Sequence, residues 1–114
     1  MPLSPGITKA LLLLSGMRCR YCGGEATTAD HIIPQRLNGT DDAYNLIAAC
    51  QPCNSSKGGA RLPYNVEAQL RIEAWIIAPE VEHLAEQFRL AQKEAASRPR
   101  IVLARNPCNL WELI

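Results

Sequence analysis

The stretch "ACQPCNSSKGG", residues 49–59, decides the fold of this chain. Its two cysteines, Cys50 and Cys53, have the spacing of half of a metal-binding knuckle. The second cysteine is followed at once by Asn54, and Lys57 comes directly before a double glycine. Because a knuckle that only held a metal would not need these two polar side chains, the stretch indicates a metal site joined to a second chemical task.

A second CxxC pair, Cys19 and Cys22, stands earlier in the chain, and 27 residues separate the two pairs. In a reducing compartment, paired CxxC motifs favour zinc over disulfides. The separation is longer than in common zinc ribbons, so we expect a further element between the knuckles. A redox role is less favoured, because a thioredoxin-like site uses one such pair at a strand–helix turn. The fifth cysteine, Cys108, is expected to be a small buried hydrophobic residue.

Length and composition limit the class of protein. With 114 residues, of which 47% are hydrophobic, the chain has the size and the core-forming content of one folded domain, residues 1–114, and not of a disordered segment. A net charge of +1 does not by itself point to nucleic acid. Residues 1–65 carry six basic and four acidic side chains, whereas residues 66–98 carry four and six. An anion-binding surface is therefore expected in the first half.

No segment approaches the roughly 18–20 apolar residues that a membrane-spanning helix needs. The run "ALLLL" at residues 10–14, preceded by Lys9, imitates a signal peptide. It is shorter than a signal-peptide core of about 7–15 residues, and no cleavage site follows it. We therefore expect a soluble, cytoplasmic protein without a membrane partner, and we interpret the run as part of a buried helix.

The N-terminal helix is predicted for residues 4–15. Ser4 is placed to cap it, Pro5 suits the first helical position, and Gly16 can end it.

The core is expected to comprise residues 17–60, beginning with the first knuckle. Residues 27–34, "TTADHIIP", predict a strand that Pro34 closes. Residues 45–49 predict a second short apolar strand that pairs with the first across a loop rich in turn-forming residues. After the second knuckle, a helical turn or two is expected to end at the double glycine.

The C-terminal part is predicted to be a helical extension, residues 66–97, followed by a tail. Residues 66–78 and 80–97 form two helical patterns separated by Pro79. In the remainder, residues 98–114, "RIVLA" predicts a strand or an extended packing segment, and the apolar tail is expected to dock on the core.

Asp30 and His31 stand next to one another in the first predicted strand. Adjacent side chains of a strand point to opposite faces, so the two would share one site only if the strand is twisted or bulged there. The pair is a weak signal alone, and Asn45 alone is weaker, because it is a common strand-start residue.

Taken in order, "CRYCGG…TTADHIIP…NLIAACQPCNSSKG" resembles the HNH endonucleases, in particular their branch with four zinc-binding cysteines. The two CxxC pairs, DHxxP, NL and CNxxK occur in the family's order, over residues 19–58. The resemblance implies a small single α+β domain: a ββα-metal core, stabilised by a four-cysteine zinc site and flanked by helices.

The resemblance also implies roles for individual residues. Asp30 would be a metal ligand and His31 the general base, while Asn45 would support the hairpin loop and so orient the histidine. Asn54 fills the last position of the motif as a second metal ligand, where many members have His, which makes this chain an HNN variant. An amide oxygen is a harder ligand than imidazole and favours Mg²⁺ or Mn²⁺. Lys57, on the same helix face, would meet a phosphate oxygen.

The implied activity is metal-dependent cleavage of DNA, in one strand or both, to 5′-phosphate and 3′-hydroxyl ends, with one structural zinc. The zinc ligands would be four residues: Cys19, Cys22, Cys50 and Cys53. The candidate contacts to the DNA backbone are four arginines: Arg18, Arg20, Arg36 and Arg61.

One alternative of a different class stays open: a non-catalytic, zinc-stabilised module that binds nucleic acid or protein. The CxxC pairs fit this module equally well, but it leaves the other motif residues unexplained. DNA is the expected partner, and the sequence also leaves open a homodimer or a larger assembly.

Overall fold

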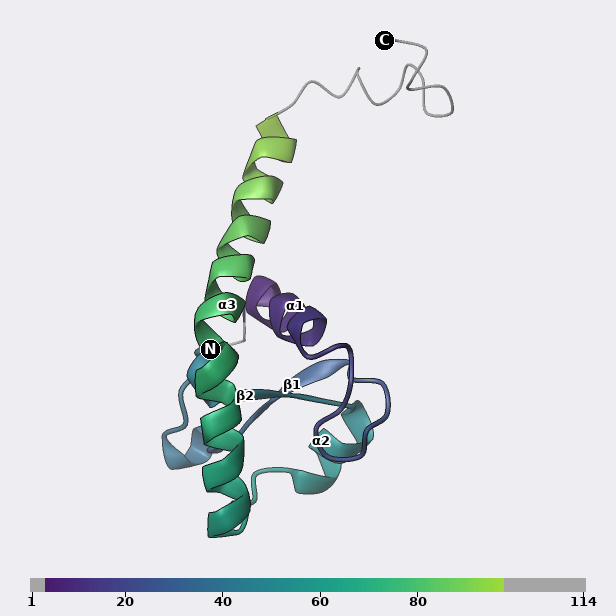
Figure 1. The fold of residues 1–114 in the computed structure, drawn as a ribbon, viewed down its shortest axis with the longest axis vertical. Helices are drawn as coiled ribbons and strands as arrows, with labels where there is room; N and C mark the ends of the chain where they lie inside the picture. Colours follow the sequence, from purple (N-terminus) through teal and green to yellow (C-terminus); the bar gives the residue numbers. More distant parts are fainter. Residues whose placement is uncertain (1–3, 98–114) are drawn as a thin grey trace.

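Two short strands and three α-helices make up the described part of the chain, residues 4–97 of a computed structural model (Figure 1). The elements in order are α1 (Pro5–Leu14), β1 (Thr28–His31), β2 (Leu46–Ala49), α2 (Gln51–Lys57) and α3 (Tyr64–Ser97), with 3₁₀ turns η1 (Gln35–Leu37) and η2 (Ala43–Asn45) between the strands. The α+β prediction is confirmed. The expectations for Cys108 and for residues 98–114 lie outside the described residues.

The two predicted strands form an antiparallel pair in which Thr28 lies opposite Ala49 and His31 opposite Leu46. β1 ends at His31, three residues earlier than predicted. The backbone N–H of Ile32 still donates to the carbonyl of Asn45 at 2.8 Å, but the next N–H, from Ile33, donates to a side chain instead. The ladder therefore stops where the loop begins.

α1 confirms the N-terminal helix with ends one residue inside the predicted range. Ser4 stands at the N-cap position, although its side chain makes no capping hydrogen bond. Beyond the helix, Gly16 adopts a positive φ of 68°. Only one side of the apolar run is buried: Ala10 and Leu11 are in the core, whereas Leu13 is 50% exposed.

The prediction of two C-terminal helices is wrong, because α3 runs without a break through Pro79. A proline removes one backbone hydrogen bond, here the one that would reach the carbonyl of Trp75. Both residues are exposed, so a water molecule can donate a hydrogen bond to that carbonyl. Ala74 and Ala78 on one side of the proline and Val81 beyond it are buried. Their packing holds the two halves in one helix, because packing contributes more to helix stability than propensity does.

α3 forms the long side of the molecule, and α1 packs against its middle (Figure 1). Two ion pairs also tie it to the core, Arg20 with Glu73 at 2.6 Å and Arg61 with Glu67 at 2.8 Å. The ring of Tyr44 meets Trp75 edge-on, with centroids 4.7 Å apart. None of the helices in residues 4–97 combines the length and the apolar character needed to cross a bilayer.

Candidate active site

The four cysteines of the two knuckles come together at one end of the strand pair. Their sulfur atoms all lie within 4.8 Å of one another, and the Sγ atoms of Cys22 and Cys50 are 3.7 Å apart. A tetrahedral zinc with Zn–S bonds of about 2.3 Å sets its sulfurs about 3.8 Å apart. The cysteines are thus positioned to bind a metal ion, consistent with structural zinc.

The backbone of the first knuckle shapes this cluster. Gly23 takes a positive φ of 79°, which a glycine adopts without strain. That turn lets Cys19 N–H donate to the Gly24 carbonyl at 2.7 Å. The backbone N–H of Gly24 in turn donates to the sulfur of Cys22 at 3.4 Å. These bonds hold the loop in a shape that suits thiolate ligands.

Two thiols of this cluster, those of Cys19 and Cys53, have pKa values shifted in opposite directions. Burial acts to raise the pKa of Cys19, but backbone N–H donors outweigh it and lower that pKa to about 6. Hydrogen bonding to the thiol of Cys50 leads the causes that raise the pKa of Cys53 to about 12. Four thiolates this close together repel one another, so the set becomes fully ionised only around a cation.

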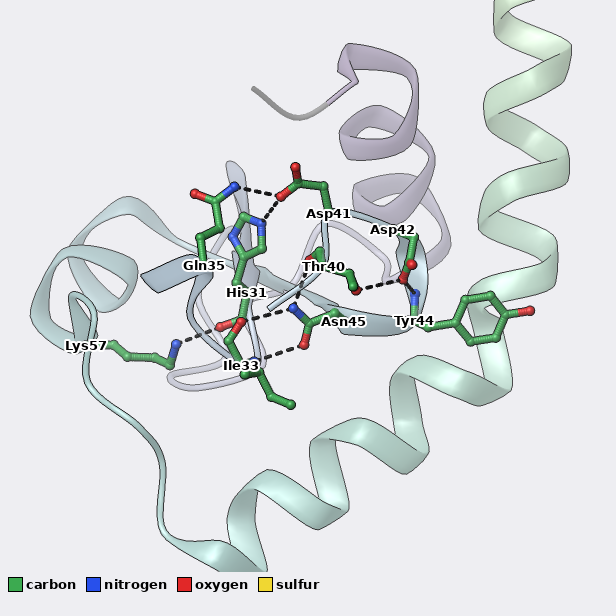
Figure 2. A network of polar contacts seen from close by, with 9 residues as sticks. All are labelled: His31, Ile33, Gln35, Thr40, Asp41, Asp42, Tyr44, Asn45 and Lys57. Carbon is green, nitrogen blue, oxygen red and sulfur yellow. Dashed lines mark hydrogen bonds and ion pairs between the residues drawn. The ribbon is translucent and has the colours of Figure 1, made fainter. Parts of the chain in front are cut away.

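Asp30 is buried in β1, 4% exposed, and both of its oxygens have partners. The hydroxyl of Tyr21 donates to Oδ2 at 2.6 Å. The ammonium of Lys57 lies 3.2 Å from Oδ2 and 3.4 Å from Oδ1. Lys57 also donates to the backbone carbonyl of His31 at 2.7 Å (Figure 2), and its side chain is only 7% exposed. Lys57 is therefore folded inward as the counter-ion of Asp30.

A cavity of about 240 Å³ opens between β1 and α2. Five motif and candidate residues contribute to its wall: Asp30, His31, Arg36, Asn54 and Lys57. Asp30 and His31 share it although they are neighbours in a strand, because His31 is the last residue of β1 and the chain turns away directly after it. A buried carboxylate and an amide at one cavity are oxygen-bearing side chains of the kind that suit a hard divalent cation.

The ring of His31 is held by a carboxylate of the loop between β1 and β2. Its Nε2 is 2.8 Å from Oδ1 of Asp41, and the amide of Gln35 donates to the same oxygen at 2.6 Å (Figure 2). The hydrogen bond with His31, followed by that from Gln35, holds the pKa of Asp41 below its usual range.

Asn45 fastens the loop between the strands. Its side chain accepts from the N–H of Ile33 at 2.9 Å and donates to the carbonyls of Ile33 and Thr40, at 3.0 and 2.8 Å (Figure 2). Gly39 packs so closely that a Cβ there would lie 1.7 Å from the carbonyl oxygen of Ile33. Any larger residue would therefore displace the loop that carries Asp41.

The four arginines predicted to contact DNA lie in different surroundings. Arg36 borders the β1–α2 cavity, and its Nε donates to the Gly59 carbonyl at 2.7 Å. Arg20 and Arg61 are engaged in the ion pairs to α3, and Arg18 lines a separate hollow beside α1 and α3. The structure therefore brings only Arg36 of the four to the cavity.

The sequence motifs do not indicate two residues of the site. Tyr21 stands between the cysteines of the first knuckle, and the CxxC pattern assigns no role to the residues between them. Asp41 is in the loop before Asn45, where the run of Asn, Gly and Asp residues predicts only turns. A carboxylate within the loop that follows a candidate catalytic histidine is the signal that could have indicated Asp41.

Comparisons with known proteins agree with this geometry. The family described as HNH endonuclease matches residues 19–59. The CRISPR-associated endonuclease Cas9 of Corynebacterium diphtheriae is 44% identical over an alignment of 46 residues, and the match covers 36% of this chain but only 4% of that protein. No solved structure gives a significant match. The matched residues hold both knuckles, both strands and α2, so the segment that matches the HNH endonuclease model is the one that carries the cysteine cluster and the β1–α2 cavity.

Proposed function

We propose that this chain is a metal-dependent DNA endonuclease. The observation that carries the proposal is the meeting of Asp30, His31 and Asn54 at one cavity, beside a four-cysteine cluster that fixes the start of α2. In this proposal residues 17–60 are the catalytic core, and α1 and α3 support it within a single domain.

His31 takes a proton from the attacking water, since neutral imidazole is a good proton acceptor near neutral pH. Asp30 and Asn54 would hold one Mg²⁺ or Mn²⁺, which would supply positive charge to stabilise the negative charge that grows on the phosphate and the leaving 3′ oxygen. Asn45 keeps the loop closed and thereby keeps the histidine in place. The proposed products are a 5′-phosphate and a 3′-hydroxyl.

DNA is the proposed substrate because the family and the related Cas9 are described as endonucleases, and because Arg36 lies at the cavity. Nε of Arg36 is bonded to the Gly59 carbonyl, and no hydrogen bond among the described residues engages its two Nη groups, which we propose contact a phosphate. A single charged contact adds little affinity, so binding by one copy is expected to be weak and dependent on salt.

Nicking of supercoiled plasmid with Mg²⁺ or Mn²⁺, followed by mapping of the product ends, tests the proposal. His31→Ala should keep the zinc and the fold and should lower turnover by roughly 10²–10⁴-fold, the usual worth of a positioned general base. His83→Ala is the matched control, because His83 is exposed on α3, far from the cavity in sequence and absent from its wall. If the wild type cuts nothing with either ion yet still binds DNA, a zinc-stabilised binding module becomes the better description.

A further inference from the structure

We propose that Asp41 is a positioning residue for catalysis, because it determines which nitrogen of the His31 ring is able to accept a proton. The inference rests on the proposed nuclease function and deepens it. It concerns a residue of the loop between β1 and β2 that the motif itself does not contain.

The bond between the two side chains has a fixed direction. Oδ1 of Asp41 lies 2.8 Å from Nε2 of His31, and an ionised carboxylate can only accept hydrogen bonds. Nε2 must therefore carry the hydrogen, and a neutral ring then has its lone pair on Nδ1. The His31 side chain is 17% exposed and the Asp41 side chain 35%. The pair is therefore partly shielded from competing water.

The other ring nitrogen, Nδ1, is the one available to accept a proton. Within residues 4–97, no protein group forms a hydrogen bond with Nδ1 of His31, and the residue contributes to the wall of the β1–α2 cavity. The backbone at His31 is fixed, because Lys57 donates to the His31 carbonyl at 2.7 Å. The Asp41 contact thus orients the ring so that Nδ1 is the proton acceptor.

Asp41 is itself held by its neighbours in the loop. Gln35 donates to the same Oδ1 at 2.6 Å, and Asn45 donates to the carbonyl of Thr40, the residue before Asp41, at 2.8 Å (Figure 2). Asn45 therefore fixes the peptide from which the Asp41 side chain extends. Asn45 therefore helps to fix the position of the His31 ring through Asp41.

The adjacent Asp42 provides a matched control. It carries the same charge in the same loop, but its carboxylate accepts from the backbone N–H of Tyr44 at 3.1 Å and from the Thr40 hydroxyl at 3.3 Å. It forms no hydrogen bond or ion pair with His31 in the described part of the chain. Asp42→Asn preserves an acceptor for the Tyr44 N–H and removes the same charge as a change at position 41.

The first measurement is an NMR spectrum of the His31 ring in zinc-loaded protein without added Mg²⁺ or Mn²⁺, at about pH 8, where unperturbed imidazole is neutral. A His83→Gln background leaves one histidine. The parent and Asp42→Asn should show a slowly exchanging Nε2–H proton and a single tautomer. Asp41→Ala should lose the slow proton and show both tautomers, while Asp41→Asn, whose amide oxygen still accepts, should fall between them.

The second measurement is plasmid cleavage with Mn²⁺. Asp41→Ala should lower kcat by roughly 10–10²-fold with KM little changed, a smaller loss than removal of the base itself. Asp41→Asn should recover part of the rate, and Asp42→Asn should cleave as the parent does. An Asp41→Ala protein with the parent's kcat and the parent's ring spectrum would overturn the inference. If the parent cleaves no DNA at all, the proposed function is wrong, and the ring spectrum alone decides the role of Asp41.

Discussion

The hydroxyl of Tyr21 donates a 2.6 Å hydrogen bond to Oδ2 of Asp30 and so joins the first knuckle to the buried carboxylate of β1. Tyr21 stands between Cys19 and Cys22, and its ring packs against both clusters of the hydrophobic core. Burial, and after it the bond to Asp30, raises the pKa of Tyr21 well above its usual value. The phenol therefore stays protonated and remains a permanent donor to the carboxylate.

Tyr21→Phe should weaken the binding of the catalytic cation without removing the zinc. The phenol fixes the orientation of the Asp30 carboxylate, and loss of such a supporting hydrogen bond typically costs about 10–10²-fold in metal affinity. Electron paramagnetic resonance of free Mn²⁺ during a titration measures this affinity without any cleavage reaction.

The control for that change is Tyr44→Phe, because the Tyr44 ring packs on Trp75 and its hydroxyl makes no hydrogen bond within the described residues. This variant should bind Mn²⁺ as the parent does. Equal Mn²⁺ affinity in Tyr21→Phe and the parent would show that Asp30 needs no support from the knuckle.

A second prediction is that the freshly purified protein contains one tightly held zinc per chain. Cys53→Ser should lose the zinc and unfold most of residues 17–60, since metal binding in a small site of this kind is largely folding free energy. Elemental analysis and circular dichroism check this. Cys108→Ser, which changes a cysteine outside both pairs, should retain the zinc. A folded parent protein with no zinc would contradict the prediction.

The sequence predicted the order of the elements well because the signals were local. The knuckle cysteines, the β-favouring residue types of the strands and the glycines after α2 each act within a few positions of one another. The four sulfurs then had to meet, since neither pair completes a zinc site alone. The meeting of Asp30 and Asn54 at one cavity followed from the family resemblance and not from any local pattern.

The errors and omissions came from contacts between distant residues. Pro79 looked like a helix boundary because the packing of Ala78 and Val81 on the core is invisible in the local pattern. The motif predicts that Lys57 meets a phosphate oxygen, and it gives no sign that Lys57 also pairs with Asp30, 27 residues earlier in the chain. No periodicity in a sequence indicates that two such side chains are paired and buried.

The third prediction concerns the ion pair between Arg20 and Glu73, which fastens α3 to the first knuckle. The bond from Arg20, opposed by burial and aided by Gln69, lowers the pKa of Glu73. For a carboxylate whose folded pKa lies below its unfolded value, the stabilisation is fully present above the unfolded value of about 4.3 and is lost as the pH falls through the folded one.

Glu73→Gln should therefore lower the free energy of unfolding by about 0.2–1 kcal/mol at pH 7, the range for partly exposed pairs. The difference from the parent should narrow as the pH falls toward 4. Urea unfolding of both proteins over this pH range measures it, and any loss of zinc in acid affects both alike. Glu82→Gln, at an exposed acid of α3 with no ion pair among the described residues, should have little effect at any pH. If the free energies of unfolding of Glu73→Gln and the parent differed by the same amount at every pH, the Arg20–Glu73 pair would contribute nothing to stability.

The last prediction concerns Lys57 and its competition with the catalytic cation. Lys57 and Asp30 form a buried pair, with side chains 7% and 5% exposed, and a divalent cation at Asp30 would have to share this carboxylate with the ammonium or displace it. Lys57→Met keeps the length of the side chain and removes the charge. Without a divalent cation, removing one partner of a buried pair should destabilise the protein by about 3 kcal/mol.

The same variant should bind Mn²⁺ more tightly than the parent, because the competing positive charge is gone. It should nevertheless cleave DNA more slowly than the parent. In the parent, the ammonium that the cation displaces from Asp30 becomes available to a phosphate oxygen, and Lys57→Met has no ammonium to make this contact. That part of the loss should be smaller than for His31→Ala and should shrink as salt is added, because salt screens the phosphate contact that only the parent makes. Urea unfolding with and without Mn²⁺, Mn²⁺ titration and plasmid cleavage measure the three effects. Weaker Mn²⁺ binding in Lys57→Met would mean that Lys57 supports the cation site and does not compete for it.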